Sequence, residues 1–228
     1  MSSVDAVLFD AGGVLLLPDP TVLGPLLAPY GADISVESLT RAHYAAMRAQ
    51  DVDGKVHDDW HVYDAAYVRS CGVPEREREE AAVVLGATRT AHLWRWPIVE
   101  SVVALRSLHE SGVPIGVVSN AAGQIESVLG RFGVCQVGEG EGVPVLIIVD
   151  STIVGVAKPD PAIFSFALDV LDVKPEHVGY VGDSYANDVV GARAAGMRPF
   201  LLDPYDDHAG AEYDRIKAVA DLLDVVST

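Results

Sequence analysis

The sequence has few of the features that mark secreted or nucleic-acid-binding proteins. Only two of its 228 residues are cysteines, Cys71 and Cys135, which is too few for a disulfide framework in a chain of this length. Neither has a partner at metal-ligand spacing, so we expect two reduced thiols in a cytoplasmic protein. Basic residues are scarce, with 16 Lys and Arg against 33 Asp and Glu and a net charge of −17. This balance argues against non-specific binding to nucleic acid or to an anionic membrane.

Long hydrophobic runs are also missing. No run of about 18 apolar residues occurs, and a transmembrane helix needs one. The first residues lack a basic stretch and their apolar run is interrupted by Asp10 and two glycines, so we expect no signal peptide. Half of the residues are nevertheless hydrophobic and the mean hydropathy is +0.25. A sizeable core is therefore available, and the length predicts one main domain with a smaller module.

Short apolar runs alternate with amphipathic helical patterns along most of the chain. Their apolar character is continuous, which is typical of strands buried on both faces of a parallel sheet. The runs span residues 6–9, 113–118, 145–149, 178–181 and 199–202. This alternation predicts an α/β fold, a doubly wound and mostly parallel sheet with helices between the strands.

A helical insert interrupts the alternation. After the first predicted strand we find no second buried strand for about 80 residues, only helix-like stretches around 21–29, 35–50, 56–71 and 75–94. Ser35, with Ser38 three residues later, is an imperfect helix-start signal. We therefore predict two domains, an α/β core of residues 1–17 and 97–228 and a helical domain of residues 18–96.

Two further patterns resemble binding motifs without matching them. The glycine-rich segment from Gln136 to Pro144 lacks the lysine of a P-loop and does not lead from a strand directly into a helix, so we expect a surface loop or hairpin. His57 and His61 lie one helical turn apart, but a zinc-protease pattern would need Glu in place of Asp58 and a third ligand. We expect an ordinary helix there, and contact with a substrate stays open.

Polar residues gather where predicted strands end, and ligand sites of open α/β sheets lie at that edge. The four segments are Asp10-Ala11-Gly12-Gly13-Val14, Ser119-Asn120, Lys158-Pro159-Asp160-Pro161 and Gly182-Asp183-Ser184-Tyr185-Ala186-Asn187-Asp188. Taken singly, each is explained by helix capping or turn chemistry. In this order, each associated with a strand end, they favour one shared site.

The residue types in these segments predict phosphoryl chemistry. Clustered carboxylates repel one another unless a cation neutralises them, and hard oxygen ligands suit Mg²⁺. A hydroxyl and an ammonium suit phosphate oxygens. A carboxylate beside the metal can attack phosphorus. The implied reaction is phosphoryl transfer to Asp10, followed by hydrolysis of the acyl phosphate.

The four segments resemble the ordered motifs of the haloacid dehalogenase (HAD) superfamily, and the insert resembles a helical cap between the first and second motifs. The resemblance covers essentially the whole chain and implies a HAD-like Rossmannoid core. It implies that Asp10 is the nucleophile. The implied Mg²⁺ ligands are Asp10, the backbone carbonyl of Gly12, Asp183 and Asp188, and the implied phosphoryl-binding residues are Ser119, Asn120, Lys158 and Gly13.

One position departs from the family pattern. Phosphatases and phosphomutases of the family usually carry a second aspartate two residues after the nucleophile, where it protonates the leaving group and then activates water. Here that residue is Gly12. General acid–base catalysis is worth roughly 10²–10⁴-fold. We therefore expect another proton donor, slow turnover or a substrate with a good leaving group.

The resemblance leaves three functions to compare. A magnesium-dependent phosphatase acting on a small phosphorylated metabolite is our first hypothesis, because Asp183 is retained and halide displacement from carbon needs no metal. A haloacid dehalogenase, or a phosphonatase that would use Lys55, is the second. The third is a binding protein whose catalytic site has decayed, which Gly12 keeps open. We expect no nucleic-acid or membrane partner and a mobile helical lid, and the oligomeric state is open.

Overall fold

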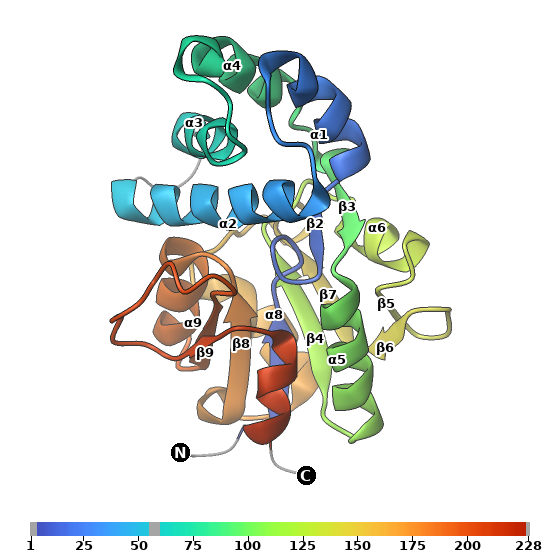
Figure 1. Cartoon of the computed structure of the whole chain (residues 1–228). Helices are drawn as coiled ribbons and strands as arrows, with labels where there is room; N and C mark the ends of the chain where they lie inside the picture. Colours follow the sequence, from blue (N-terminus) through green and yellow to red (C-terminus); the bar gives the residue numbers. More distant parts are fainter. Residues whose placement is uncertain (1–3, 55–59, 227–228) are drawn as a thin grey trace. The chain divides into compact units, whose positions relative to one another are not determined.

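The computed structural model describes residues 4–54 and 60–226 of the 228-residue chain. The chain divides into two compact units. The core unit comprises residues 1–16 and 97–228, and the helical unit comprises residues 17–96. Figure 1 shows the elements of both.

A six-stranded sheet organises the core unit. Its strand order is β10-β9-β8-β1-β4-β7, and every neighbouring pair is parallel. The strands are β1 (Ala6–Phe9), β4 (Ile115–Ser119), β7 (Ile147–Asp150), β8 (Val178–Gly182), β9 (Arg198–Leu202) and β10 (Arg215–Ile216). All residues of β1, β4 and β8 are buried, as continuous apolar runs predict. The predicted parallel α/β fold is confirmed.

Helices flank this sheet (Figure 1). They are α5 (Val99–Glu110), α6 (Ile125–Arg131), α7 (Ser151–Val154), α8 (Ala162–Leu171) and α9 (Val190–Ala194), with a π-helix at Tyr185–Val189 and 3₁₀ turns at Pro175–His177 and Val219–Asp224. Helix α8 shows why such segments fold as they do. Ile163, Phe164, Ala167 and Leu171 recur at helical spacing, and all four are buried. They pack in one cluster with Tyr180 of β8.

The region before β7 differs from the prediction of one strand over residues 145–149. Val145 ends a separate strand β6 (Val143–Val145), which pairs in parallel with β5 (Cys135–Val137) as a two-stranded sheet. The chain changes sheets at Leu146, which is exposed and donates its N–H to the carbonyl of Ile115 at 2.8 Å. The glycine-rich segment connects β5 to β6, and residues 138–141 are exposed, as expected of a surface loop.

In its described residues, 17–54 and 60–96, the helical unit has four α-helices around its own core. These are α1 (Pro20–Leu27), α2 (Val36–Asp53), α3 (His61–Ser70) and α4 (Arg78–Thr88), with 3₁₀ turns at Ala28–Tyr30, Glu75–Glu77 and Ala91–Leu93. Ser35 caps α2, because its hydroxyl accepts from the N–H of Ser38 at 3.2 Å. Leu23, Leu39, Tyr67 and Leu85 belong to one buried cluster. His57 lies outside the described residues.

Two short strands border the helical unit, contrary to our expectation of none. β2 (Leu16–Pro18) and β3 (Trp94–Pro97) form a two-stranded sheet. Segments of three and four residues are too short to show a periodic pattern, so the sequence did not reveal them. The predicted helix over 75–94 is correspondingly shorter, since α4 ends at Thr88. Within the described ranges, no helix is long and apolar enough to cross a membrane.

Candidate active site

The candidate site lies at the carboxyl edge of the six-stranded sheet. Asp10 follows β1, Ser119 is the last residue of β4, and Asp183 follows β8. Because β1 pairs with β4 on one side and β8 on the other, all in parallel, the three strand ends are neighbours. Ser119 and Asp183 are buried. The structure thus brings three of the four sequence segments together through strand order.

Three carboxylates form a cluster at this edge. Asp10, Asp183 and Asp188 each offer an oxygen atom, and these oxygens all lie within 4.8 Å of one another. Asp183 and Asp188 are buried, and 14% of the Asp10 side chain is exposed. The loop carrying Asp188 is tightly packed. A Cβ at Gly182 would lie 2.1 Å from Asp188 Cγ, so only glycine fits there.

Lys158, from the remaining segment, supplies the positive charge of the cluster. Its side chain is 1% exposed. Its Nζ lies 3.0 Å from Asp10 Oδ2 and 2.7 Å from Asp188 Oδ1, and it donates to the hydroxyl of Tyr180 at 2.8 Å. The side chain of Asn120 fixes the lysine backbone, donating to its carbonyl at 2.9 Å and accepting from its N–H at 2.8 Å. Asn120 therefore acts on the loop that holds Lys158.

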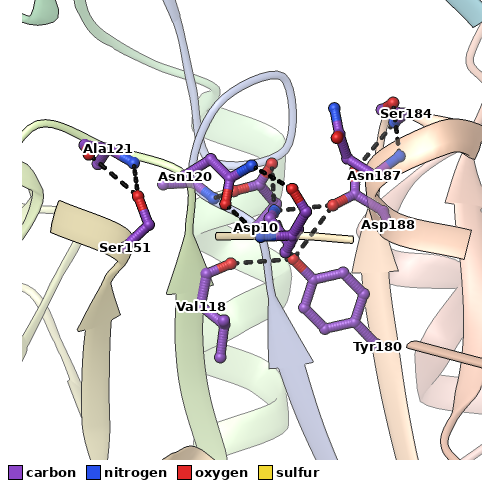
Figure 2. Close-up of polar contacts among 11 residues, drawn as sticks. Asp10, Val118, Asn120, Ala121, Ser151, Tyr180, Ser184, Asn187 and Asp188 are labelled. Atoms are coloured by element: carbon purple, nitrogen blue, oxygen red, sulfur yellow. Dashed lines mark hydrogen bonds and ion pairs between the residues drawn. The ribbon is translucent and has the colours of Figure 1, made fainter. Parts of the chain in front are cut away.

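Tyr180 contacts Lys158 at this site, and sequence reasoning missed it. It is fully buried within β8, and its hydroxyl lies 2.9 Å from the carbonyl oxygen of Val118 and 3.3 Å from Asp188 Oδ1 (Figure 2). In the sequence it sits inside an apolar run, Val178 to Val181, where a tyrosine is indistinguishable from a core residue. The one available signal was the phenolic hydroxyl, because a tyrosine hydroxyl on a buried ring usually has a hydrogen-bond partner.

Asp150 and Ser151 hold the loop after Ser119, and the sequence did not single them out. Ser151 Oγ donates to the carbonyl of Ala121 at 3.1 Å and accepts from its N–H at 3.0 Å (Figure 2). Asp150 Oδ2 accepts from the N–H of Gly123 at 2.9 Å. The loop that follows Ser119 is thereby tied to the end of β7.

The loop after Asp10 turns back tightly. The N–H groups of Leu15 and Leu16 both donate to the carbonyl of Ala11 at 2.9 Å. Gly13 has φ 67°, which favours glycine, and its N–H donates to Leu16 at 2.8 Å. A phosphoryl group would have to compete with that bond to reach the Gly13 N–H. Gly12 is not among the described glycines with positive φ, so its backbone conformation accepts a side chain.

Comparison with known proteins identifies the family. A model of the haloacid dehalogenase-like hydrolases matches residues 4–196. The chain belongs to the haloacid dehalogenase-like hydrolase family. The prediction of a HAD hydrolase is thereby confirmed.

Individual HAD relatives cover different parts of the chain. Haloacid dehalogenase-like hydrolase domain-containing protein 3 of Bos taurus is 35% identical over 47% of this chain, and the match spans 40% of that protein. Glyceraldehyde 3-phosphate phosphatase of Methanopyrus kandleri is 28% identical over 85% of this chain and 81% of its own length. The crystal structure of a HAD phosphatase from Thermococcus onnurineus has a TM-score of 0.58 at 21% identity, covering 99% of this chain and 97% of the other. That likeness shows the shared fold.

The charges of this HAD site are out of balance. The pKa of Asp10 is raised to about 7, chiefly by burial; Lys158 opposes this rise, and the nearby Asp188 and Asp183 add to it. For Lys158, burial lowers the pKa, but Asp10 and Asp188 outweigh burial and the net shift is upward. Three clustered carboxylates, two of them in contact with one ammonium, leave two negative charges when all are ionised. A buried site of this kind fits a divalent cation held by hard oxygen ligands.

A further polar atom belongs to the same loop. Within the described part of the chain, Asn187 Oδ1 is a buried side-chain oxygen that lacks a hydrogen-bond partner. Asn187 lies in the π-helix that begins after Ser184 and contains Asp188. Buried acceptors are normally satisfied by protein or water. An unmatched acceptor beside an acidic cluster is consistent with a hydrated ion there.

Proposed function

We propose that this HAD hydrolase is a magnesium-dependent phosphatase that hydrolyses a small phosphorylated metabolite through an aspartyl-phosphate on Asp10. The observation that carries the proposal is the cluster of three carboxylates at neighbouring strand ends, two of which contact one buried lysine. The relative from Methanopyrus kandleri, which this chain matches over most of its length, is named a phosphatase. At 28% identity, the substrate of that relative does not identify the substrate of this chain.

In the proposed reaction, a carboxylate oxygen of Asp10 attacks phosphorus, and the ester oxygen leaves with the bonding electron pair and takes up a proton. Water then attacks the aspartyl-phosphate, releasing inorganic phosphate and restoring Asp10. Lys158, whose Nζ lies 3.0 Å from Asp10 Oδ2, favours the ionised form of Asp10 against the effect of burial. The hydroxyl of Ser119, at the end of β4, is proposed to hold a phosphoryl oxygen.

Asp10, Asp183, Asp188 and the carbonyl of Gly12 would hold Mg²⁺. When bound, Mg²⁺ neutralises charge on the carboxylates and on the phosphoryl group. The same retained carboxylates favour phosphoryl transfer over halide displacement, which needs no metal. Gly12 has no side chain that could protonate the leaving group. We therefore propose either a substrate with a good leaving group or a proton donor elsewhere in the protein.

We also propose that the helical unit is a cap that closes during turnover. The unit is inserted directly after the strand that ends at Asp10, and it has a hydrophobic core of its own. Caps of this kind exclude water and set specificity. We also propose a cytoplasmic location, because both cysteines are free and buried.

The deciding experiment measures phosphate release from p-nitrophenyl phosphate and from a panel of phosphorylated metabolites, with Mg²⁺ and after exhaustive chelation. Chloroacetate and phosphonoacetaldehyde are included as dehalogenase and phosphonatase substrates. We expect phosphate release that disappears with the metal. Full activity after chelation, or chloride release from chloroacetate, would reject the phosphatase and favour the second hypothesis. No turnover of any substrate would favour the decayed binding protein.

A further inference from the structure

Lys158 uses all of its donors within the protein. An ammonium group has three N–H bonds. Its Nζ has three acceptors within hydrogen-bonding distance, namely Asp188 Oδ1 at 2.7 Å, Tyr180 Oη at 2.8 Å and Asp10 Oδ2 at 3.0 Å. The side chain is 1% exposed, so solvent has little access to it. A phosphoryl oxygen can therefore reach Lys158 only by displacing one of these acceptors.

The Tyr180 hydroxyl is the neutral member of this set, and it also has a second partner. A phenol has one proton to donate, and Val118 O at 2.9 Å is its nearer acceptor, with Asp188 Oδ1 at 3.3 Å. The hydroxyl thus donates to the backbone and presents a lone pair to Lys158.

The ring of Tyr180 holds that hydroxyl in place. It packs edge-on against Phe164 of α8, with ring centroids 4.9 Å apart and an interplanar angle of 78°. Val118 immediately precedes Ser119 at the end of β4. One hydroxyl therefore connects the strand that carries Ser119, the lysine and the loop that carries Asp188.

We propose that Tyr180 is a positioning residue of the HAD reaction, whose hydroxyl holds the Lys158 ammonium against Asp10 so that the lysine acts on the nucleophile. The inference rests on the proposed function for its kinetic consequence. Tyr180 touches no substrate in this proposal. It removes the freedom of the ammonium to turn away from the two carboxylates.

The test compares Tyr180→Phe with Tyr67→Phe. Both tyrosines are almost fully buried, and Tyr67 donates to the carbonyl of Leu39 at 3.0 Å in the helical core without contacting Lys158. Each variant loses one hydroxyl bonded to a backbone carbonyl, so general packing costs are matched. We expect kcat of Tyr180→Phe on p-nitrophenyl phosphate to fall roughly 10- to 100-fold, the range of one charge-assisted hydrogen bond. The Kd of inorganic phosphate, measured by calorimetry, should change less than about twofold.

A measurement independent of turnover follows the ammonium itself by ¹⁵N NMR. The chain has four lysines, and Lys174 and Lys217 are exposed. A buried ammonium exchanges protons slowly, and the variant Lys158→Met assigns its signal by removing it. We expect the signal in the wild-type protein and in Tyr67→Phe, and its loss or displacement in Tyr180→Phe.

Equal kinetic effects in the two variants, or an effect confined to KM and phosphate affinity, would overturn the proposal. An unchanged ammonium signal in Tyr180→Phe would overturn it as well. If the wild-type protein releases no phosphate from any substrate, the proposed function fails. The NMR comparison then still decides whether Tyr180 positions Lys158.

Discussion

Buried carboxylates of the helical unit are paired differently from those of the candidate active site. In the helical unit, Asp19 and Asp64 are each buried and each has its own guanidinium, Arg95 at 2.8 Å and Arg89 at 2.5 Å. In the candidate active site, three carboxylates lie together and one lysine contacts two of them.

A carboxylate paired with one guanidinium leaves no net charge buried inside the folded protein. Shared pairing leaves charge uncancelled, and a fold keeps such a cluster only at some cost in stability. The difference separates structural carboxylates from the candidate catalytic ones. It also offers matched substitutions, since the same change can be made in both units.

The largest contrast is expected between Asp10→Asn and Asp64→Asn. An amide is a poor nucleophile and a weaker metal ligand, so Asp10→Asn should reduce phosphate release by roughly 100-fold or more while the fold stays intact. Asp64→Asn should lower stability and leave kcat of the folded protein near the wild-type value. Phosphate release and circular dichroism check both. More than a few per cent residual activity in Asp10→Asn would reject its role as nucleophile.

Removing one partner of a structural pair should cost stability. Arg89→Met leaves the buried Asp64 carboxylate without its guanidinium partner. The Arg89 side chain is only 19% exposed, so the ion pair that is lost is largely shielded from water. We expect a loss of about 2–3 kcal/mol in the free energy of unfolding, measured in urea.

The matched control is Arg76→Met. Arg76 pairs with Glu77 at 3.0 Å, but 81% of its side chain is exposed, so the change should stay within about 0.5 kcal/mol. Equal losses in both variants would remove the distinction between buried and exposed pairs in this unit.

A smaller effect is expected in the pH dependence of stability without metal. Burial, with Asp188 and Asp183 adding to it, raises the pKa of Asp10 from 3.8 to about 7 in the folded protein. The folded state then binds the proton more tightly than the unfolded chain. The stabilisation that comes from protonated Asp10 is complete below the pKa of Asp10 in the unfolded chain, and it is lost as pH rises through 7.

In the presence of a chelator, the Tm of the wild-type protein should therefore fall more between pH 5 and pH 7.5 than the Tm of Asp10→Asn. The difference should be on the order of a few degrees. Adding Mg²⁺ at pH 7.5 should raise the wild-type Tm more than that of Asp10→Asn. Parallel melting curves at both pH values would show that Asp10 is not destabilised by its neighbours.

How far the sequence predicts this molecule depends on the signal that each part leaves. Buried parallel strands leave continuous apolar runs, and the runs at residues 6–9 and 178–181 match β1 and β8 closely. Polar residues such as Asp10 and Ser119 stand out because they end or follow such runs. Tyr180 does not, since its ring belongs to the core and only its last atom is polar. The division between β6 and β7 at Leu146 depends on which sheet offers partners, which local sequence cannot express.

The smallest expected effect concerns Gly12. If nothing replaces the missing acid, the leaving group departs unassisted, and aryl or acyl phosphates should be hydrolysed much faster than alkyl phosphates. The aspartyl-phosphate should also accumulate and give a burst. Gly12→Asp is expected to raise alkyl-phosphate turnover, because the backbone at Gly12 does not need a positive φ.

Rates on a series of leaving groups check this prediction in both proteins. Gly13→Asp is the matched control, since Gly13 has φ 67° and a side chain there is strained. A flat dependence on leaving-group pKa in the wild-type protein would show that another acid is present. Gly12 would then be no catalytic deficit.

The pairing of β2 with β3 has a consequence for how such proteins diversify. The chain leaves the sheet after β1 and returns before α5 through two hydrogen-bonded strands, with Asp19 N–H bonded to the carbonyl of Leu93 at 2.9 Å. Closing a longer or shorter excursion costs little extra entropy once its ends are joined. The segment between these two strands can therefore be exchanged without redesigning the parallel sheet. In the proposed cap, we expect such an exchange to change substrate choice and leave the candidate site in place.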